Sequence, residues 1–111
     1  MLVNITDVAR VIRSKNSGPF EITFDIMFKS PQWFEYFCEK DIISRELICR
    51  LYNVDETKIL AIVHFKPANA IKFTLKRRIP SGSPGETDIY GAQQHAPLLG
   101  IEFEAPEYEK T

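Results

Sequence analysis

The chain has 111 residues, of which 44% are hydrophobic and 26% are charged, and its formal net charge is −1. This length and composition predict one compact domain over residues 1–111 and exclude a disordered chain or a fibrous repeat. A charge so close to zero gives no overall attraction to nucleic acids or anionic membranes, so we expect neither among the partners. The cationic run at residues 76–78 is interpreted as the solvated end of a strand.

The N-terminal residues indicate the cellular compartment. No apolar run is long enough to span a membrane, and Asp7 and Arg10 stand where a signal peptide would need apolar residues. The sequence therefore predicts a cytoplasmic protein.

Cys38 and Cys49 lie among apolar residues in separate predicted helices, which favours free cysteines in the core. Because they lack the paired spacing of a zinc site, we expect no metal and no cofactor.

Two elements are predicted in the N-terminal quarter. Residues 6–15 predict a short helix, because Thr6 can cap it and apolar residues follow at helical spacing as far as Ile12. Valine and isoleucine in this stretch would also suit a strand. Residues 20–28 predict a strand, because apolar residues stand at the even positions and mostly polar ones between them. This strand should have one face on the core and one wetter face.

Two amphipathic helices are predicted next. Ser30 and Pro31 are typical of a helix start, and an apolar stripe over Trp33–Cys38 follows them. A second helix is predicted to begin after Ser44 and to end within residues 53–57. Each helix has one apolar side that needs a partner in the core.

Further strands are predicted in the second half of the chain. Ile59–Phe65 is almost continuously apolar, which indicates a strand covered on both faces or in the middle of the sheet. Ile71–Leu75 alternates apolar and polar residues, and the two segments predict a hairpin. A last short strand is expected at Ile101–Phe103, and the tail at 104–111 should fray.

These elements describe an α+β fold. We expect a ferredoxin-like two-layer sandwich with a mixed or antiparallel sheet of about four strands and helices on one face. The connection between residues 28 and 59 is long enough to bring the second strand parallel to the first, with a right-handed crossover.

The connection between residues 79 and 101 is longer than most, and it is interpreted either as disordered or as a binding loop. His95 and Asp88 are its candidate catalytic residues for proton transfer. A structural histidine and a turn-capping aspartate are the commoner roles. The segment SGSPG has the amides and hydroxyls of an anion site but lacks the lysine and helix entry of a phosphate loop. The candidate ligand-binding residues of the connection are Ser81, Gly82, Ser83, Gln93 and Gln94.

A second polar concentration lies between Arg13 and Glu21. Arg13 offers a bidentate fork for a carboxylate or phosphate, and Lys15 offers a point charge. A solvated helix end is the alternative interpretation. His64, inside an apolar strand, is interpreted as a core or strand-facing histidine. The other candidate ligand-binding residues of this concentration are Ser14, Asn16 and Gly18.

Three segments, TDVARVIRSKNSGPFEITFDI, FKPANAIKFTL and SGSPGETDIYGAQQHAPLL, resemble the family called domain of unknown function 4387 over nearly the whole chain. Members of that family look like relatives or partners of the AtuA proteins, named for acyclic terpene utilisation. The C-terminal ferredoxin-like domain of AtuA proteins carries an Arg-Ser…Lys-Gly loop. Arg13, Ser14, Lys15 and Gly18 are similar to that loop, with lysine and glycine in a different order. The resemblance implies an AtuA-like partner and a role in acyl-CoA or carboxylic-acid catabolism, without a catalytic assignment.

Two functional hypotheses follow. In the first, the protein is a small accessory subunit or ligand-binding domain that joins an AtuA-like partner and helps to hold an anionic small molecule. The half-polar faces of the first and third strands would then be partner surface. In the alternative, the protein is a stand-alone acid/base enzyme of the hydratase, isomerase or lyase type. His95 or Asp88 would transfer a proton while Arg13 and Lys15 hold the substrate. A homo-oligomer is compatible with both hypotheses.

Overall fold

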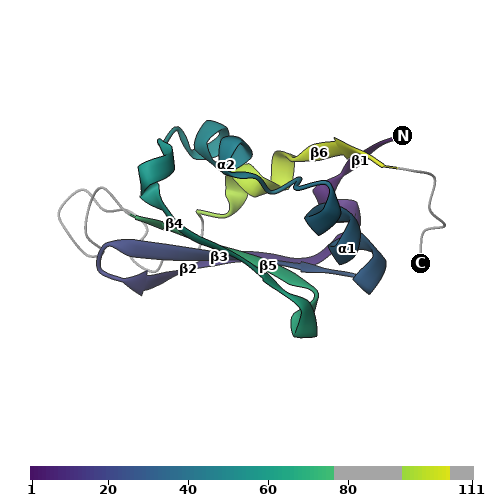
Figure 1. Ribbon diagram of the computed structural model, residues 1–111, viewed down its shortest axis with the longest axis horizontal. Coiled ribbons are helices and arrows are strands. Elements are labelled where there is room, and N and C mark those ends of the chain that lie inside the picture. The colour runs from purple at the N-terminus through teal and green to yellow at the C-terminus, as the bar shows by residue number, and fades with distance from the viewer. Residues whose placement is uncertain (77–93, 106–111) are drawn as a thin grey trace.

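The computed structural model of the protein describes residues 1–76 and 94–105 and shows two layers (Figure 1). One layer is a four-stranded sheet, and the other contains two α-helices, several 3₁₀ turns (η) and a two-stranded sheet. The strands are β1 (Leu2–Asn4), β2 (Ala9–Gly18), β3 (Glu21–Phe28), β4 (Ile59–Phe65), β5 (Ala70–Lys76) and β6 (Glu102–Glu104). The helices and turns are α1 (Pro31–Glu39), α2 (Arg45–Tyr52), η1 (Ile5–Asp7), η2 (Glu56–Lys58), η3 (Lys66–Ala68) and η4 (Ala96–Gly100).

The four-stranded sheet has the order β2-β3-β5-β4, and every neighbouring pair is antiparallel. In the chain, α1 and α2 connect β3 to β4, and both helices lie on the same face of the sheet (Figure 1). As predicted, β3 and β4 run in the same direction, but β5 lies between them. The predicted α+β fold is confirmed, but the fourth strand of this sheet is β2, whereas the strand predicted at 101–103 pairs with β1 in a separate two-stranded sheet.

The helix predicted over residues 6–15 is wrong, because this segment forms η1 and then β2. Asn4 rather than Thr6 caps the turn: Asn4 Oδ1 accepts a hydrogen bond from the Thr6 N–H at 2.8 Å. The pairing of β2 with β3 shifts register between Ala9 and Val11. This irregularity interrupts the alternation of a strand, so the apolar residues on either side of it imitate helical spacing.

Aromatic rings fill much of the core between the two layers. Phe24 in β3 is 1% exposed, and its ring stacks on that of Phe73 in β5 with centres 4.5 Å apart. The ring of Tyr52 in α2 lies 5.0 Å from that of Phe24. At the other end of the helical layer, the ring centres of Phe37 in α1 and Phe103 in β6 are 4.7 Å apart. Burial of these rings therefore holds the two helices against the sheets.

Both predicted helices are confirmed, and each is capped by the serine that precedes it. Ser30 Oγ accepts a hydrogen bond from the Trp33 N–H at 3.3 Å, and Ser44 Oγ accepts one from the Leu47 N–H at 3.1 Å. These hydroxyls satisfy backbone donors that have no partner within the helix. α2 ends at Asn53, whose φ of 52° is the left-handed conformation that stops a helix.

The variant Ser44→Ala should lower the free energy of unfolding by about 1 kcal/mol, because the first turn of α2 loses its cap. Urea denaturation followed by circular dichroism measures this change. Ser17→Ala is the matched control, because Ser17 is exposed in β2 and a surface substitution changes stability by at most about 0.5 kcal/mol. Equal losses in the two variants would contradict the capping role.

β4 occupies the predicted residues 59–65 and forms the predicted hairpin with β5, but its predicted place in the sheet is wrong. It is an edge strand, and His64 is exposed on it rather than buried in the core. β5 pairs with both β3 and β4 and takes the central place instead. A run of apolar residues is typical of a central strand, so the apolar character of β4 needs another explanation.

β1 and β6 join the two ends of the described chain. The last predicted strand is observed at Glu102–Glu104, where Val3 of β1 stands opposite Phe103. The Ala105 N–H donates a hydrogen bond to the Met1 carbonyl at 2.9 Å, and residues 106–111 of the predicted tail lie outside the described residues. Among the helices of residues 1–76 and 94–105, none is long and apolar enough to cross a membrane.

Candidate functional site

Within the described residues, one face of the four-stranded sheet carries no helix, and we call it the open face (Figure 1). The even-numbered residues 22–28 of β3 are buried toward the helices, so Asp25 projects toward the open face. The register places Arg13 of β2 and Lys72 of β5 directly opposite Asp25, and Val63 of β4 opposite Lys72. One row of side chains therefore crosses all four strands.

Asp25 is the centre of an ion-pair row on the open face. It is only 4% exposed. Arg13 Nε donates a hydrogen bond to Asp25 Oδ2 at 3.0 Å, and Lys72 Nζ lies 3.5 Å from Asp25 Oδ1. A carboxylate removed from water requires neighbouring charges and hydrogen bonds in its place. Arg13 and Lys72 provide them, and Asp25 in turn fixes both cations at the surface.

One oxygen of this carboxylate keeps a free acceptor position. Asp25 Oδ1 is buried and has no hydrogen-bond partner within the described residues. The Lys72 ammonium, 3.5 Å away, attracts Oδ1 by charge without the geometry of a hydrogen bond. The hydrogen bond from Arg13 to Asp25 Oδ2 is therefore the stronger of the two interactions in the row.

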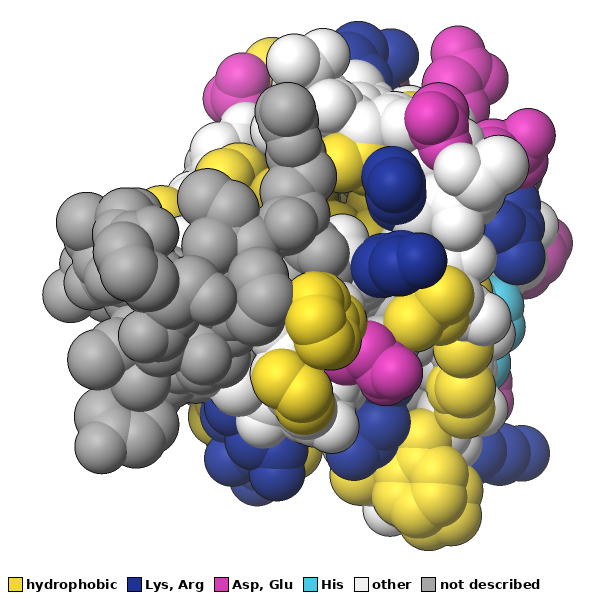
Figure 2. Space-filling model, turned by 90° about the vertical axis from the view of Figure 1, so that its left-hand side faces the viewer, with side chains coloured by type: hydrophobic (Ala, Val, Ile, Leu, Met, Phe, Trp, Pro, Cys, Tyr) yellow, Lys and Arg dark blue, Asp and Glu magenta, His cyan; other side chains and the backbone are white. Residues whose placement is uncertain are grey.

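Apolar side chains flank the ion-pair row at β4. Val63 and Phe65 are 47% and 43% exposed. Lys72 Nζ lies 5.6 Å from the centre of the Phe65 ring, within the range of a cation–π contact. Figure 2 shows hydrophobic and cationic side chains next to one another on the lower part of the molecule, toward which the open face points. Exposed apolar surface of this kind marks interaction sites.

The charge of the open face is opposite in sign to that of the whole chain. Its described residues include four cations and two carboxylates, a net charge of +2, whereas the chain carries −1. Between the charged rows, the hydroxyls of Thr23 and Thr74 lie 3.2 Å apart and link β3 to β5. An acidic surface therefore complements this face. Its charged residues are Arg13, Lys15, Glu21, Asp25, Lys72 and Lys76.

The predicted binding residues of β2 do not form a single site. Because β2 is a strand, Arg13 and Lys15 lie on the open face, whereas Ser14 and Asn16 point toward the helical layer. Ser14 is buried there. Gly18 ends β2 at the turn into β3, with a φ of 157°. A single small ligand would therefore contact only part of this predicted cluster.

His95 lies in the helical layer, at the start of η4. Its carbonyl accepts a hydrogen bond from the Leu98 N–H at 2.9 Å, and the neighbouring Gln94 carbonyl accepts one from the Tyr52 hydroxyl at 2.8 Å. His95 Nδ1 is buried without a hydrogen-bond partner in the described part of the chain. Arg13 and Lys15 of β2 face the other side of the sheet, so they and His95 are not brought together. The remaining predicted loop residues lie outside the described residues: Ser81, Gly82, Ser83, Asp88 and Gln93.

The Tyr52 hydroxyl gives a pH-dependent prediction. Burial raises the pKa of Tyr52 above its ordinary value of 10.0. Above pH 10 the unfolded chain therefore loses this proton more readily than the folded chain, and the contribution of Tyr52 to stability declines as the pH rises. At pH 7, the free energy of unfolding of Tyr52→Phe should be about 1 kcal/mol lower than that of wild type, because the hydrogen bond to the Gln94 carbonyl is lost. The difference from wild type in urea denaturation should shrink above pH 10, and a constant difference would contradict this assignment.

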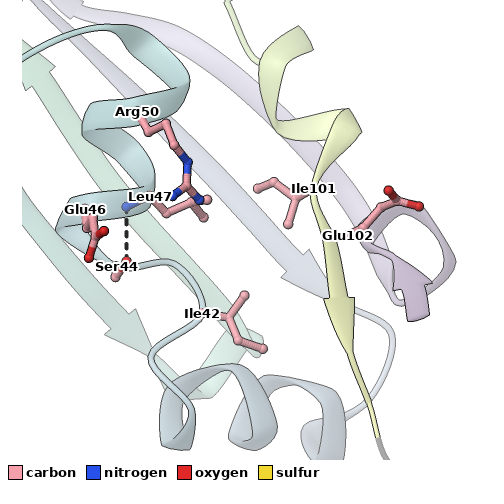
Figure 3. Close-up of a pocket in the computed structure, with 7 residues that line it drawn as sticks. All are labelled: Ile42, Ser44, Glu46, Leu47, Arg50, Ile101 and Glu102. Carbon is pink, nitrogen blue, oxygen red and sulfur yellow. Dashed lines mark hydrogen bonds between the residues drawn. The ribbon is translucent and has the colours of Figure 1, made fainter. Parts of the chain in front are cut away.

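A small hollow lies between α2 and β6 (Figure 3). Its volume is about 290 Å³, at the lower end for a ligand pocket. The guanidinium of Arg50 points into the gap beside Ile101, while Glu46 and Glu102 also line it. This excess of negative charge opposes the predicted anionic ligand, and none of the sequence-predicted site residues lines the hollow. The lining residues are Ile42, Ser44, Glu46, Leu47, Arg50, Ile101 and Glu102.

A second hollow, of about 240 Å³, has two lysines, Lys58 and Lys76, in its lining. Asp55 also lines it and accepts hydrogen bonds from the N–H and hydroxyl of Thr57. These hydrogen bonds lower the pKa of Asp55, so its carboxylate acts as a charged cap of η2. The hollow carries more positive charge than the one beside β6, and it borders the end of the described segment at Lys76.

The cysteines are free thiols, as predicted, and each is half-buried against the core. Burial raises the pKa of the Cys38 thiol, and the negative charge of Glu35 raises it further. Cys38 is therefore protonated near neutral pH and a weak nucleophile. Across residues 1–76 and 94–105, no group of three or more His, Cys, Asp or Glu side chains is placed to hold a metal ion.

Asp25 and Lys72 were not among the residues singled out in the sequence. A usable signal was present, because aspartate is disfavoured in strands and Asp25 stands in the middle of the clearest predicted strand. The pairing of this strand with two cation-bearing neighbours becomes visible only once the strand order is known.

Comparison with known proteins identifies the family of this chain. The family model described as Domain of unknown function (DUF4387) matches residues 5–102. No curated protein and no solved structure matches the chain. The family match spans the strands of the open face, both helices and η4. The chain therefore belongs to the DUF4387 family.

Proposed function

We propose that the protein is a small accessory subunit that binds a partner protein through the open face of its four-stranded sheet. One observation carries this proposal. On the sheet face that no described helix covers, the exposed side chains of Val63 and Phe65 lie beside an ion-pair row centred on a buried carboxylate. A sheet face that is exposed only to solvent carries mainly polar side chains. Large apolar side chains at this place favour a protein partner.

The ion-pair row supports specific docking. Asp25 holds Arg13 and Lys72 in place before any partner arrives. Carboxylates of a partner can then pair with these cations without the full entropic cost of ordering two long side chains. The net positive charge of the open face favours an acidic partner and rejects a basic one.

The partner that we propose is an AtuA-like protein, in cytoplasmic acyl-CoA or carboxylic-acid catabolism. This part rests on the resemblance of the three sequence segments described above and is an analogy at the level of the family. The ferredoxin-like class belongs to the same proposal. A single helical layer over a four-stranded antiparallel sheet supports it.

The alternative of a stand-alone acid/base enzyme has less support. A proton-transferring group must lie within hydrogen-bonding reach of the substrate that the cations hold. Arg13 and Lys15 lie on the open face, and His95 lies in the helical layer. We therefore favour the accessory subunit.

The direct test is co-expression of the tagged chain with an AtuA-like protein from the same genome, followed by affinity purification and gel filtration. We expect a stoichiometric complex that elutes as one species. A chain that elutes alone, with no AtuA-like protein retained, would show that the proposed partnership is wrong.

Charge on the open face should control the rate of association. Lys15→Glu is expected to slow association with the partner about tenfold at low ionic strength, and added salt should reduce the difference. Arg45→Glu is the matched control, because it reverses one exposed charge at the start of α2, in the helical layer. Surface plasmon resonance at several salt concentrations measures both variants. A similar slowing by Arg45→Glu would argue against docking at the open face.

A further inference from the structure

In the described part of the chain, β4 is an edge strand whose outer side pairs with no other strand. β5 pairs with one side of β4, and within residues 1–76 and 94–105 no strand pairs with the other. After a register shift between Ile59 and Ala61, the ladder is regular as far as Phe65. Every second residue of such a strand directs its backbone N–H and C=O groups outward. β4 therefore presents a row of backbone donors and acceptors to a further strand.

The two edges of the sheet differ in how they discourage pairing. β2 carries the charged residues Arg10, Arg13 and Lys15, and its ladder has two irregularities. Charges and irregularities of this kind protect edge strands from unwanted partners. Residues 59–65, with the sequence ILAIVHF, contain no acidic residue, lysine, arginine, proline or glycine. As far as the described residues go, the β4 edge thus lacks such protection, and an edge of this kind is a template for strand addition.

Lysines bracket this neutral edge. Lys58 precedes β4 and Lys66 follows it, at a separation of about 26 Å along an extended strand. Two copies of β4 in full overlap would place lysine against lysine in either direction. Antiparallel copies would oppose Lys58 to Lys66, and parallel copies would oppose each lysine to its own copy. Because like charges directly opposite one another destabilise a strand pair, the edge disfavours a second copy of this chain.

We propose that β4 binds an extended segment of the partner protein as a fifth strand of the sheet. The segment is neutral and mainly apolar over about seven residues, the length of β4, and carries acidic residues at both ends. Its acidic ends pair with Lys58 and Lys66. Half of its side chains extend the surface of Val63 and Phe65. The inference rests on the proposed function, since it describes how one segment of that partner is held.

A synthetic peptide tests this inference without the partner. The probe has a centre of alternating valine and threonine with two glutamates at each end, and the control peptide has lysines in place of the glutamates. Amide hydrogen exchange of the full chain is followed by NMR. With the acidic probe at ten times its dissociation constant, exchange at every second residue of β4 should slow about tenfold. The lysine-ended peptide should leave exchange unchanged.

The double variant Lys58→Glu, Lys66→Glu should reverse this preference and bind the lysine-ended peptide instead. Strand addition is overturned if neither peptide protects the outward-facing amides of β4 or if both protect them equally. It is also overturned if these amides, which do not pair with β5, are already protected in the free chain and the chain sediments as a dimer. Failure of the peptides while the AtuA-like protein still co-purifies removes only this inference. Failure of co-purification while the acidic peptide protects β4 removes only the proposed partner.

Discussion

Replacing Phe24 with alanine is expected to lower the free energy of unfolding by roughly 3–5 kcal/mol, because the removed ring leaves a cavity in the core. Phe24 stacks on Phe73 and contacts Tyr52, so its ring joins β3, β5 and α2. The free energy of unfolding of a small domain is about 5–15 kcal/mol in total. Phe24→Ala would therefore remove a large part of the stability. Urea denaturation monitored by tryptophan fluorescence measures this loss.

Phe20→Ala is the matched control for this variant. Phe20 directly precedes β3 and is 49% exposed, whereas Phe24 is 1% exposed. The control should change the free energy of unfolding by no more than about 0.5 kcal/mol. Comparable losses in Phe20→Ala and Phe24→Ala would contradict the placement of the core between the two layers.

The variant Val63→Glu is expected to weaken partner binding about 100-fold, which corresponds to about 2.7 kcal/mol. Val63 lies at the junction of the apolar surface and the ion-pair row, opposite Lys72. A glutamate there would be desolvated on docking and would compete for the cation that attracts an acidic partner. The fold should tolerate the change, because Val63 is 47% exposed. Isothermal titration calorimetry measures the affinity.

Leu99→Glu tests whether any new surface carboxylate has this effect. Leu99 is 40% exposed in η4, on the helical side of the molecule. This control should bind the partner with an affinity within about twofold of wild type, since its side chain lies away from the open face. Equal weakening by Val63→Glu and Leu99→Glu would place the interface elsewhere.

The elements predicted correctly are those whose signals are local. Alternation alone predicted β3, and the serine caps with apolar stripes predicted α1 and α2. In β2, the irregularity after Ala9 disturbs the alternation, and a local pattern then imitates a helix. The edge position of β4 depends on strand order, which no local pattern contains.

The candidate site was predictable only in part. The sequence drew attention to Arg13 and Lys15, and both lie on the open face. Their neighbours Ser14 and Asn16 face the opposite way, because the face of each residue depends on helix or strand periodicity. The role of Asp25 could not be predicted from the sequence, because it depends on cations on two strands that are distant in sequence. A polar cluster in sequence is therefore one site only when its local structure is known.

The central claim, that the open face is buried by a partner, is tested most directly by hydroxyl-radical footprinting with mass spectrometry. Oxidation of the wild-type chain is compared alone and in complex with the AtuA-like protein, which needs no substitution. We expect oxidation of Val63 and Phe65 to fall several-fold in the complex, since docking removes their exposed surface from water. Oxidation of Leu2 and Leu99, which are exposed outside the open face, should not change. Protection of Leu2 and Leu99 with unchanged oxidation of Val63 and Phe65 would contradict the claim.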